Sequence, residues 1–116
     1  MRLKIKAKYE GRLVGDFEEL VRKARDQVLT SSVSAHLEDE SRFRAGELRV
    51  QLMIFERYSM TGENRLSLSL LLIEEAGGAK LSAIASGGSR GLFFKINTFG
   101  EEAFLDTLGP FIKKYS

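Results

Sequence analysis

Three side chains that can bind a metal ion alternate along one short stretch, at His36, Glu38 and Glu40. In an extended strand every second side chain points to the same face, so the three would form a row with steps of roughly 7 Å. Imidazole and carboxylate groups are suitable ligands for zinc or manganese. A ligand set drawn from one strand usually needs a further ligand from elsewhere in the chain. We therefore interpret the row as a solvated acidic strand face, and we predict no metal and no other cofactor.

A glycine-rich stretch at Gly87–Gly91 includes Gly88, Ser89 and Arg90. Glycine allows positive φ angles and close approach of the backbone to a neighbour. Successive backbone N–H groups there, beside Arg90, could hold an anion. The Lys-Ser/Thr pair of a P-loop is missing, and no parallel βαβ unit surrounds the stretch. A turn that joins the sheet to the last helix is the favoured interpretation. Binding of a small apolar or anionic ligand at Gly87–Gly91 is the alternative.

Nucleophilic catalysis finds little support in the residue types. The chain has one histidine and no cysteine, so the usual nucleophile–base pairs reduce to a serine or threonine with His36. The Gly-x-Ser-x-Gly motif of a nucleophile elbow is absent, since residues 86–89 do not match it. We predict that the protein is not an enzyme and has no catalytic residues.

Basic residues gather near the start of the chain. Lys4, Lys6 and Lys8 alternate along one strand face, and the patch is extended by Arg2, Arg12, Arg22, Lys23 and Arg25. Such a patch could contact nucleic-acid phosphates. Aromatic stacking platforms are missing apart from Tyr9, which alternation directs to the opposite face. Lysines on a first strand also protect a sheet edge from aggregation. Nucleic-acid binding is therefore the third hypothesis.

The length and composition fit one domain spanning residues 1–116. A hydrophobic content of 43% with 29% charged residues excludes general disorder. No run approaches the roughly 18 apolar residues that a bilayer-spanning helix needs. Residues 1–6 lack the apolar core of a signal peptide. We expect a soluble cytoplasmic protein with no membrane partner.

Residue periodicity gives the order of the elements. Two-residue alternation predicts strands over residues 3–9, 33–43, 48–60, 66–73 and 80–86. Helical spacing predicts one helix from an N-cap at Asp16 to about Thr30, and another from an N-cap at Thr98 to the end, interrupted at Pro110. Strands joined by short turns are antiparallel, and both helices need an apolar sheet face. We predict an α+β domain with an antiparallel sheet and both helices on one face.

Apolar residues occupy both sides of the two central strands. We place the helices on the face formed by the even-numbered leucine and valine residues of segments 48–60 and 66–73. The opposite face then receives Met53, Phe55, Leu71 and Ile73, where a soluble antiparallel sheet usually carries polar groups. A second subunit would cover these residues; so would sheet curvature around a pocket, or a segment such as residues 92–94, and the remaining alternative is an apolar face that nothing covers. The predicted function is self-association as a homodimer with Met53, Phe55, Leu71 and Ile73 as the interface.

Two resemblances accompany these predictions. The element order is similar to that of the TATA-box-binding protein and of helix-grip domains, which often hold apolar ligands between the sheet and a long C-terminal helix. The segments VQLMIFERY (50–58), NRLSLS (64–69) and ASGGSRGLFF (85–94) resemble a family of small uncharacterised proteins from Gram-positive bacteria. The second resemblance covers nearly the whole chain. It implies the same fold and a bacterial cytoplasmic setting, and it carries over no catalytic residues.

Overall fold

The computed structural model describes residues 6–58, 65–87 and 94–116 of the chain. In chain order the elements are β1 (Lys6–Val14), α1 (Phe17–Ser31), β2 (His36–Ala45), β3 (Leu48–Tyr58), β4 (Arg65–Glu75), β5 (Gly78–Gly87), α2 (Phe94–Asp106) and α3 (Gly109–Tyr115). The predicted order of strand, helix, four strands and helical C-terminal part is confirmed.

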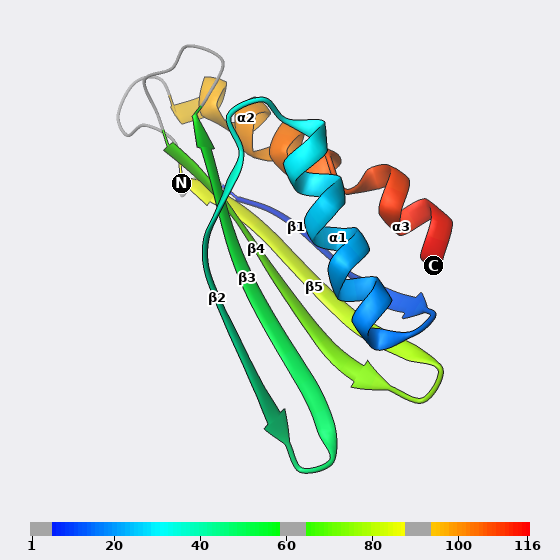
Figure 1. The fold of residues 1–116 in the computed structure, drawn as a ribbon. Helices are drawn as coiled ribbons and strands as arrows, with labels where there is room; N and C mark the ends of the chain where they lie inside the picture. The colour runs from blue at the N-terminus through cyan, green and yellow to red at the C-terminus, as the bar shows by residue number, and fades with distance from the viewer. Residues whose placement is uncertain (1–5, 59–64, 88–93) are drawn as a thin grey trace, which may run out of the picture.

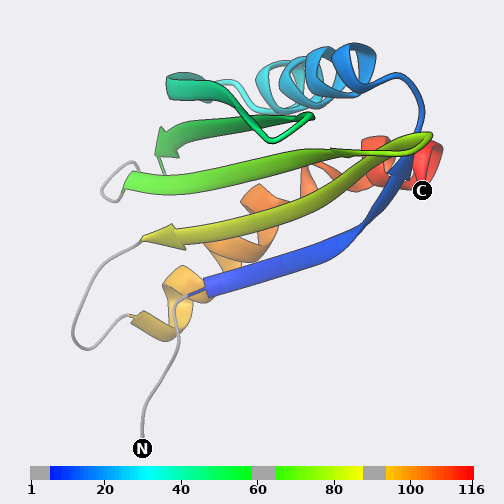
Figure 2. The same ribbon diagram turned by 90° about the horizontal axis from the view of Figure 1, so that it is seen from below.

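The strands form one five-stranded antiparallel sheet in the order β1-β5-β4-β3-β2. β2 to β5 follow one another as a meander, and β1 pairs with β5 at the far edge. Figures 1 and 2 show α1, α2 and α3 on the same side of the sheet. We call this side the closed face and the other side the open face. The predicted α+β class, with helices on one face only, is confirmed.

The helix starts and ends have identifiable local causes. Asp16 is the N-cap of α1, since its Oδ2 accepts a hydrogen bond of 3.1 Å from the backbone N–H of Glu19. α2 ends at Asp106, and α3 begins at Gly109 with Pro110 in its first turn. A proline is tolerated there because the first N–H groups of a helix have no intrahelical partner. The N-cap at Asp16 and the interruption at Pro110 are therefore confirmed.

Two boundaries differ from the prediction. β1 continues through Gly11 to Val14, because every residue of the strand keeps its partner on β5. α2 begins at Phe94 and passes through Thr98, so the Thr-x-x-Glu pattern at 98–101 does not mark the start of this helix.

The assignment of Met53 and Phe55 to the open face is wrong. Both side chains are fully buried in the core beneath the helices. Met53 lies opposite Leu70 and Phe55 opposite Leu68, and directly opposed residues of antiparallel strands point to the same face. Both sides of β3 are apolar, so alternation does not tell which side the helices cover. The register of the β3–β4 pair decides it, since a slip of one residue exchanges the faces.

The core fills the space between the closed face and the helices. α1 contributes Phe17, Leu20, Val21, Ala24 and Val28. The C-terminal helical part contributes Phe104, Leu108 and Phe111. Two arginines on the closed side of β3 lie at opposite ends of this core. The guanidinium of Arg49 lies 5.1 Å from the ring centre of Phe17, and that of Arg57 lies 4.6 Å from the ring centre of Phe104.

Candidate functional site

The open face carries a continuous group of large apolar side chains, which we call the apolar band. The band consists of Phe43, Val50, Leu52, Ile54, Leu71, Ile73 and Ile84. Cross-strand pairing joins its members, since Val50 lies opposite both Phe43 and Ile73. Phe43 is 53% exposed, Val50 is buried with 4% exposed, and the other five are half-buried. All described helices pack on the opposite side of the sheet (Figure 2), so none of them covers the band.

The outcome for the predicted interface residues is divided. Leu71 and Ile73 lie on the open face as expected, whereas Met53 and Phe55 belong to the closed face. The open face instead carries the even-numbered residues Val50, Leu52 and Ile54, which the sequence analysis had placed on the face covered by the helices. The polar residues of β3 could have identified the closed face. Arg49, Gln51 and Arg57 share the side of Met53, and their side chains bind groups on the helix-covered side.

Charge is distributed unevenly around the apolar band. One row of cross-strand partners runs from Asp39 on β2 through Ile54, Ser69 and Ile84 to Lys8 on β1. On the β2–β3 side the face also carries Glu38 and Glu56. On the β1–β5 side it also carries Arg12 and Lys80, together with Glu10, which forms an ion pair with Lys8. The band therefore lies between an acidic margin and a mainly basic one.

A polar groove on the closed face lies between α1 and the β2–β3 hairpin, where the helices leave the strands uncovered. Its charged groups bind one another. Arg42 donates to Glu18 at 2.8 Å, Arg25 donates to Glu40 at 2.9 Å, and the amide of Gln51 donates to the same carboxylate at 2.8 Å. The hydrogen bond from Arg42 lowers the pKa of Glu18 below its ordinary value. These pairs stabilise the docking of α1, and the groove offers little unpaired chemistry to a ligand.

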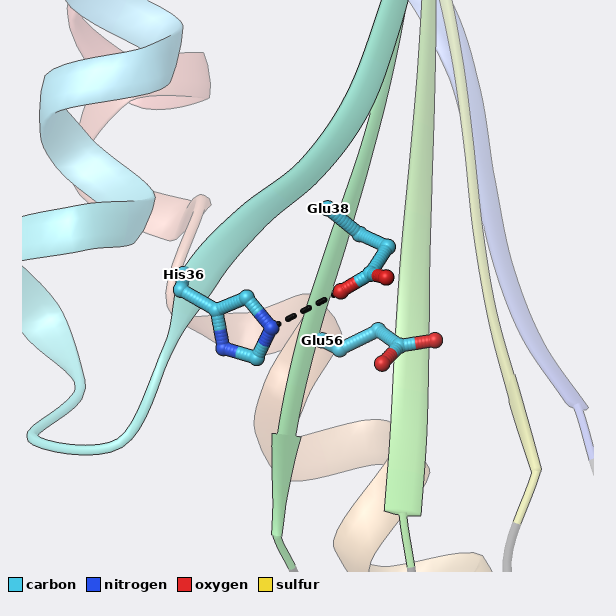
Figure 3. A group of neighbouring side chains, drawn as sticks. All are labelled: His36, Glu38 and Glu56. Carbon is cyan, nitrogen blue, oxygen red and sulfur yellow. Dashed lines mark hydrogen bonds and ion pairs between the residues drawn. The ribbon is translucent and has the colours of Figure 1, made fainter.

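The predicted row of His36, Glu38 and Glu40 is broken by the strand itself. A β-bulge between Leu37 and Asp39 shifts the register, so that Glu40 turns to the closed face opposite Met53. His36 and Glu38 remain together, with 2.9 Å between His36 Nε2 and Glu38 Oε2. Glu56 of β3 lies directly opposite His36 and joins them (Figure 3). One ligand atom from each of the three lies within 4.8 Å of the others. Glu56 was not predicted, and only the strand register reveals it.

The glycine-rich stretch is described only at its first residue. Gly87 has a φ of 113°, and a Cβ built on it would lie 2.6 Å from the carbonyl oxygen of Arg65. Glycine is therefore required at this position by the close approach of β4. Gly88, Ser89, Arg90 and Gly91 lie outside the described residues, so ligand binding at Gly87–Gly91 stays a prediction.

The basic residues of the N-terminal part do not form one patch where the structure describes them. Lys8 and Arg12 lie on the open face of β1, and Arg12 forms an ion pair with Glu75. Arg25 lies on α1 at the closed face, where it binds Glu40. Lys4 and Arg2 lie outside the described residues. The separation onto two sides of the sheet weakens the nucleic-acid hypothesis.

Within the described ranges, no helix is both long and apolar enough to cross a membrane. A family model, the family of unknown function DUF6054, matches residues 6–116. No curated protein and no solved structure matches the chain. The similarity to the TATA-box-binding protein and helix-grip folds, the Gram-positive origin and the cytoplasmic location therefore stay predictions.

Proposed function

Since the chain belongs to DUF6054, a family of unknown function, we propose a role from its geometry: a non-enzymatic module that forms a homodimer through the open face of its sheet. The observation that carries this proposal is the apolar band, which no described helix covers. Soluble antiparallel sheets usually direct polar side chains outward on the face that lacks helices. A band of isoleucine, leucine, valine and phenylalanine there favours burial against a partner.

The size of the open face suits a dimer. Five strands spaced about 4.8 Å apart, each about 33 Å long for ten residues, give a face on the order of 700 Å². A standard specific interface buries about 800 Å² per partner. Two copies packed face to face would therefore reach the usual range without contributions from the helices.

The charge distribution favours a second copy of this chain as the occupant, and it also favours one orientation. A two-fold axis that runs along the strands above β4 would bring β1 of one copy over β2 of the other. In the row described above, Lys8 would then face Asp39 of the other copy, and Ile84 would face Ile54. A two-fold axis across the strands would instead place β1 over β1, with like charges together. Self-complementarity of this kind is what an isologous interface requires.

The test is the mass of the chain in solution, measured by light scattering or sedimentation equilibrium. The wild type is expected at twice the 13.0 kDa of one chain. Phe43→Asp places a charge at the edge of the band, at a side chain that is 53% exposed, so the monomer fold should tolerate it. This variant is expected to be monomeric, with an unchanged circular dichroism spectrum.

A matched control distinguishes this effect from a general effect of added charge. Val33→Asp makes the same kind of change at a fully exposed residue between α1 and β2, outside the open face. It is expected to stay dimeric. A wild type that is monomeric up to about millimolar concentration would overturn the proposal, and so would a dimer that Phe43→Asp leaves intact.

A further inference from the structure

We propose that His36, Glu38 and Glu56 form a binding site for one divalent first-row metal ion, with Zn²⁺ as the probe of choice. The three side chains come from the adjacent strands β2 and β3 at the end of the open face, and Figure 3 shows both carboxylates on the same side of the His36 ring. The inference does not depend on the proposed dimer, because all three ligands belong to one chain.

The strand register explains why these side chains meet. His36 and Glu56 are direct cross-strand partners. In a regular strand Glu38 would lie about 7 Å further along the same face. The bulge at this point adds a residue to β2 and re-aims Glu38, and bulges of this kind frequently orient functional side chains. The bulge thus brings Glu38 Oε2 to 2.9 Å from His36 Nε2.

The separations of the ligand atoms suit metal coordination. Two ligands that each lie about 2.1 Å from a zinc ion are about 3–3.4 Å apart for angles between 90° and 109°. The His36–Glu38 separation of 2.9 Å already matches a neighbouring pair of ligands. The remaining separations of up to 4.8 Å must close by as much as about 1.5 Å, which rotation of the half-buried Glu56 side chain and the exposed Glu38 side chain can supply. The strand backbone does not need to move.

The chemistry of the ligand set selects the class of ion. One imidazole nitrogen with two carboxylate oxygens suits zinc and its neighbours in the first row better than the all-oxygen sites of calcium or magnesium. Glu56 Oε1 accepts from Arg65 Nη2, which leaves Glu56 Oε2 for a metal ion. The side chains of His36 and Glu38 are 53% and 45% exposed, so an ion can enter and can keep water at its open positions.

The experiment titrates the untagged chain with zinc chloride and follows the imidazole signals by NMR. His36 is the only histidine, so its ring signals report on this site alone. We expect saturation at one zinc per chain with a large shift of these signals, together with a higher melting temperature. His36→Ala and Glu56→Gln should each weaken zinc binding at least about tenfold. Loss of a group that only hydrogen-bonds a metal ligand already costs about that much, and loss of the ligand itself should cost more.

Glu47→Gln is the matched control, because it removes one carboxylate from the β2–β3 turn at the other end of the hairpin. It should bind zinc like the wild type. The proposal is overturned if zinc leaves the His36 signals unchanged, or if Glu56→Gln binds as tightly as the wild type. The titration is repeated on Phe43→Asp. Binding that persists in this monomeric variant separates the metal site from the dimer, and binding that is lost in it contradicts a site built within one chain.

Discussion

The two faces of β3 and β4 are built from similar residues and have different surroundings. On the closed face Met53, Phe55, Leu68 and Leu70 are fully buried beneath the helices. On the open face the neighbouring Leu52, Ile54, Leu71 and Ile73 remain partly exposed. In a strand that is apolar on both sides, the role of an apolar residue therefore depends on the sheet face to which it points. On the closed face it stabilises the monomer, and on the open face it is available to a partner.

The largest expected effect is on the free energy of unfolding, when adjacent residues that point to opposite faces are each replaced by alanine. Phe55→Ala leaves a cavity in the core and should lower the free energy of unfolding by about 3–5 kcal/mol. Ile54→Ala removes a half-buried side chain of the open face and should cost the monomer roughly 1 kcal/mol. Urea denaturation at the lowest measurable protein concentration compares the two variants with the wild type.

The same pair is then measured at higher protein concentration. A dimer that dissociates on unfolding is more stable at higher concentration. The concentration dependence should weaken for Ile54→Ala, since its contact with the second copy is lost. Equal losses for both variants at all concentrations would contradict the distinction between the faces.

A second prediction concerns a buried carboxyl group beneath the closed face. Glu101 of α2 is fully buried, and neither carboxylate oxygen has a hydrogen-bond partner among the described residues. Burial raises the pKa of Glu101 from its ordinary 4.5 to about 7, with a smaller contribution from the charge of Glu102. The folded state therefore holds this proton more tightly than the unfolded chain. Stability should fall as pH rises from about 4.5 through about 7.

Glu101→Gln removes the ionisable group and keeps the shape of the side chain. The variant should lack this fall, and at pH 8 it should be more stable than the wild type by on the order of 1–3 kcal/mol. Thermal or urea unfolding between pH 4.5 and pH 8.5 provides the measurement. Parallel pH curves for the two proteins would contradict the assignment of the fall to Glu101.

The contrast between the faces also shows what the sequence can predict. Local signals were sufficient for the N-cap at Asp16, the interruption at Pro110 and the antiparallel meander, since each depends on residues close together in the chain. The face of Met53 depends on the β3–β4 register, which local alternation does not determine when both sides are apolar. The predicted face of Glu40 was wrong for a related reason: the extra residue of the bulge reverses the alternation of the residues that follow it. Leu71 and Ile73 were assigned correctly because the even-numbered leucines of β4 do form the core.

A third prediction sharpens the orientation proposed for the open face. If Lys8 of one copy faces Asp39 of the other, then Lys8→Glu or Asp39→Lys alone should weaken the dimer by about tenfold, since like charges would meet twice across the two-fold axis. The double variant restores opposite charges and should recover most of the affinity. Sedimentation equilibrium at low and high salt checks both points. Additive weakening in the double variant would contradict this orientation and would leave the dimer itself in place.

The smallest expected effect lies at the rim of the closed face, where Arg49 and Glu74 are only partly buried. Hydrogen bonds from the side chain and the backbone N–H of Arg49 lower the pKa of Glu74 from its ordinary 4.5 to about 2. The ionised form is thus favoured in the folded state, so its contribution to stability is complete above about pH 4.5 and is lost as pH falls towards 2.

A double-mutant cycle with Glu74→Gln and Arg49→Gln isolates this coupling from the other carboxylates of the chain. We expect a small coupling free energy at pH 7 that declines steadily below pH 4.5. An exposed ion pair that gains nothing from its position would give no coupling at any pH. A measurable coupling would therefore mean that the Arg49–Glu74 pair stabilises the rim of the closed face, in addition to the apolar side chains that stabilise its centre.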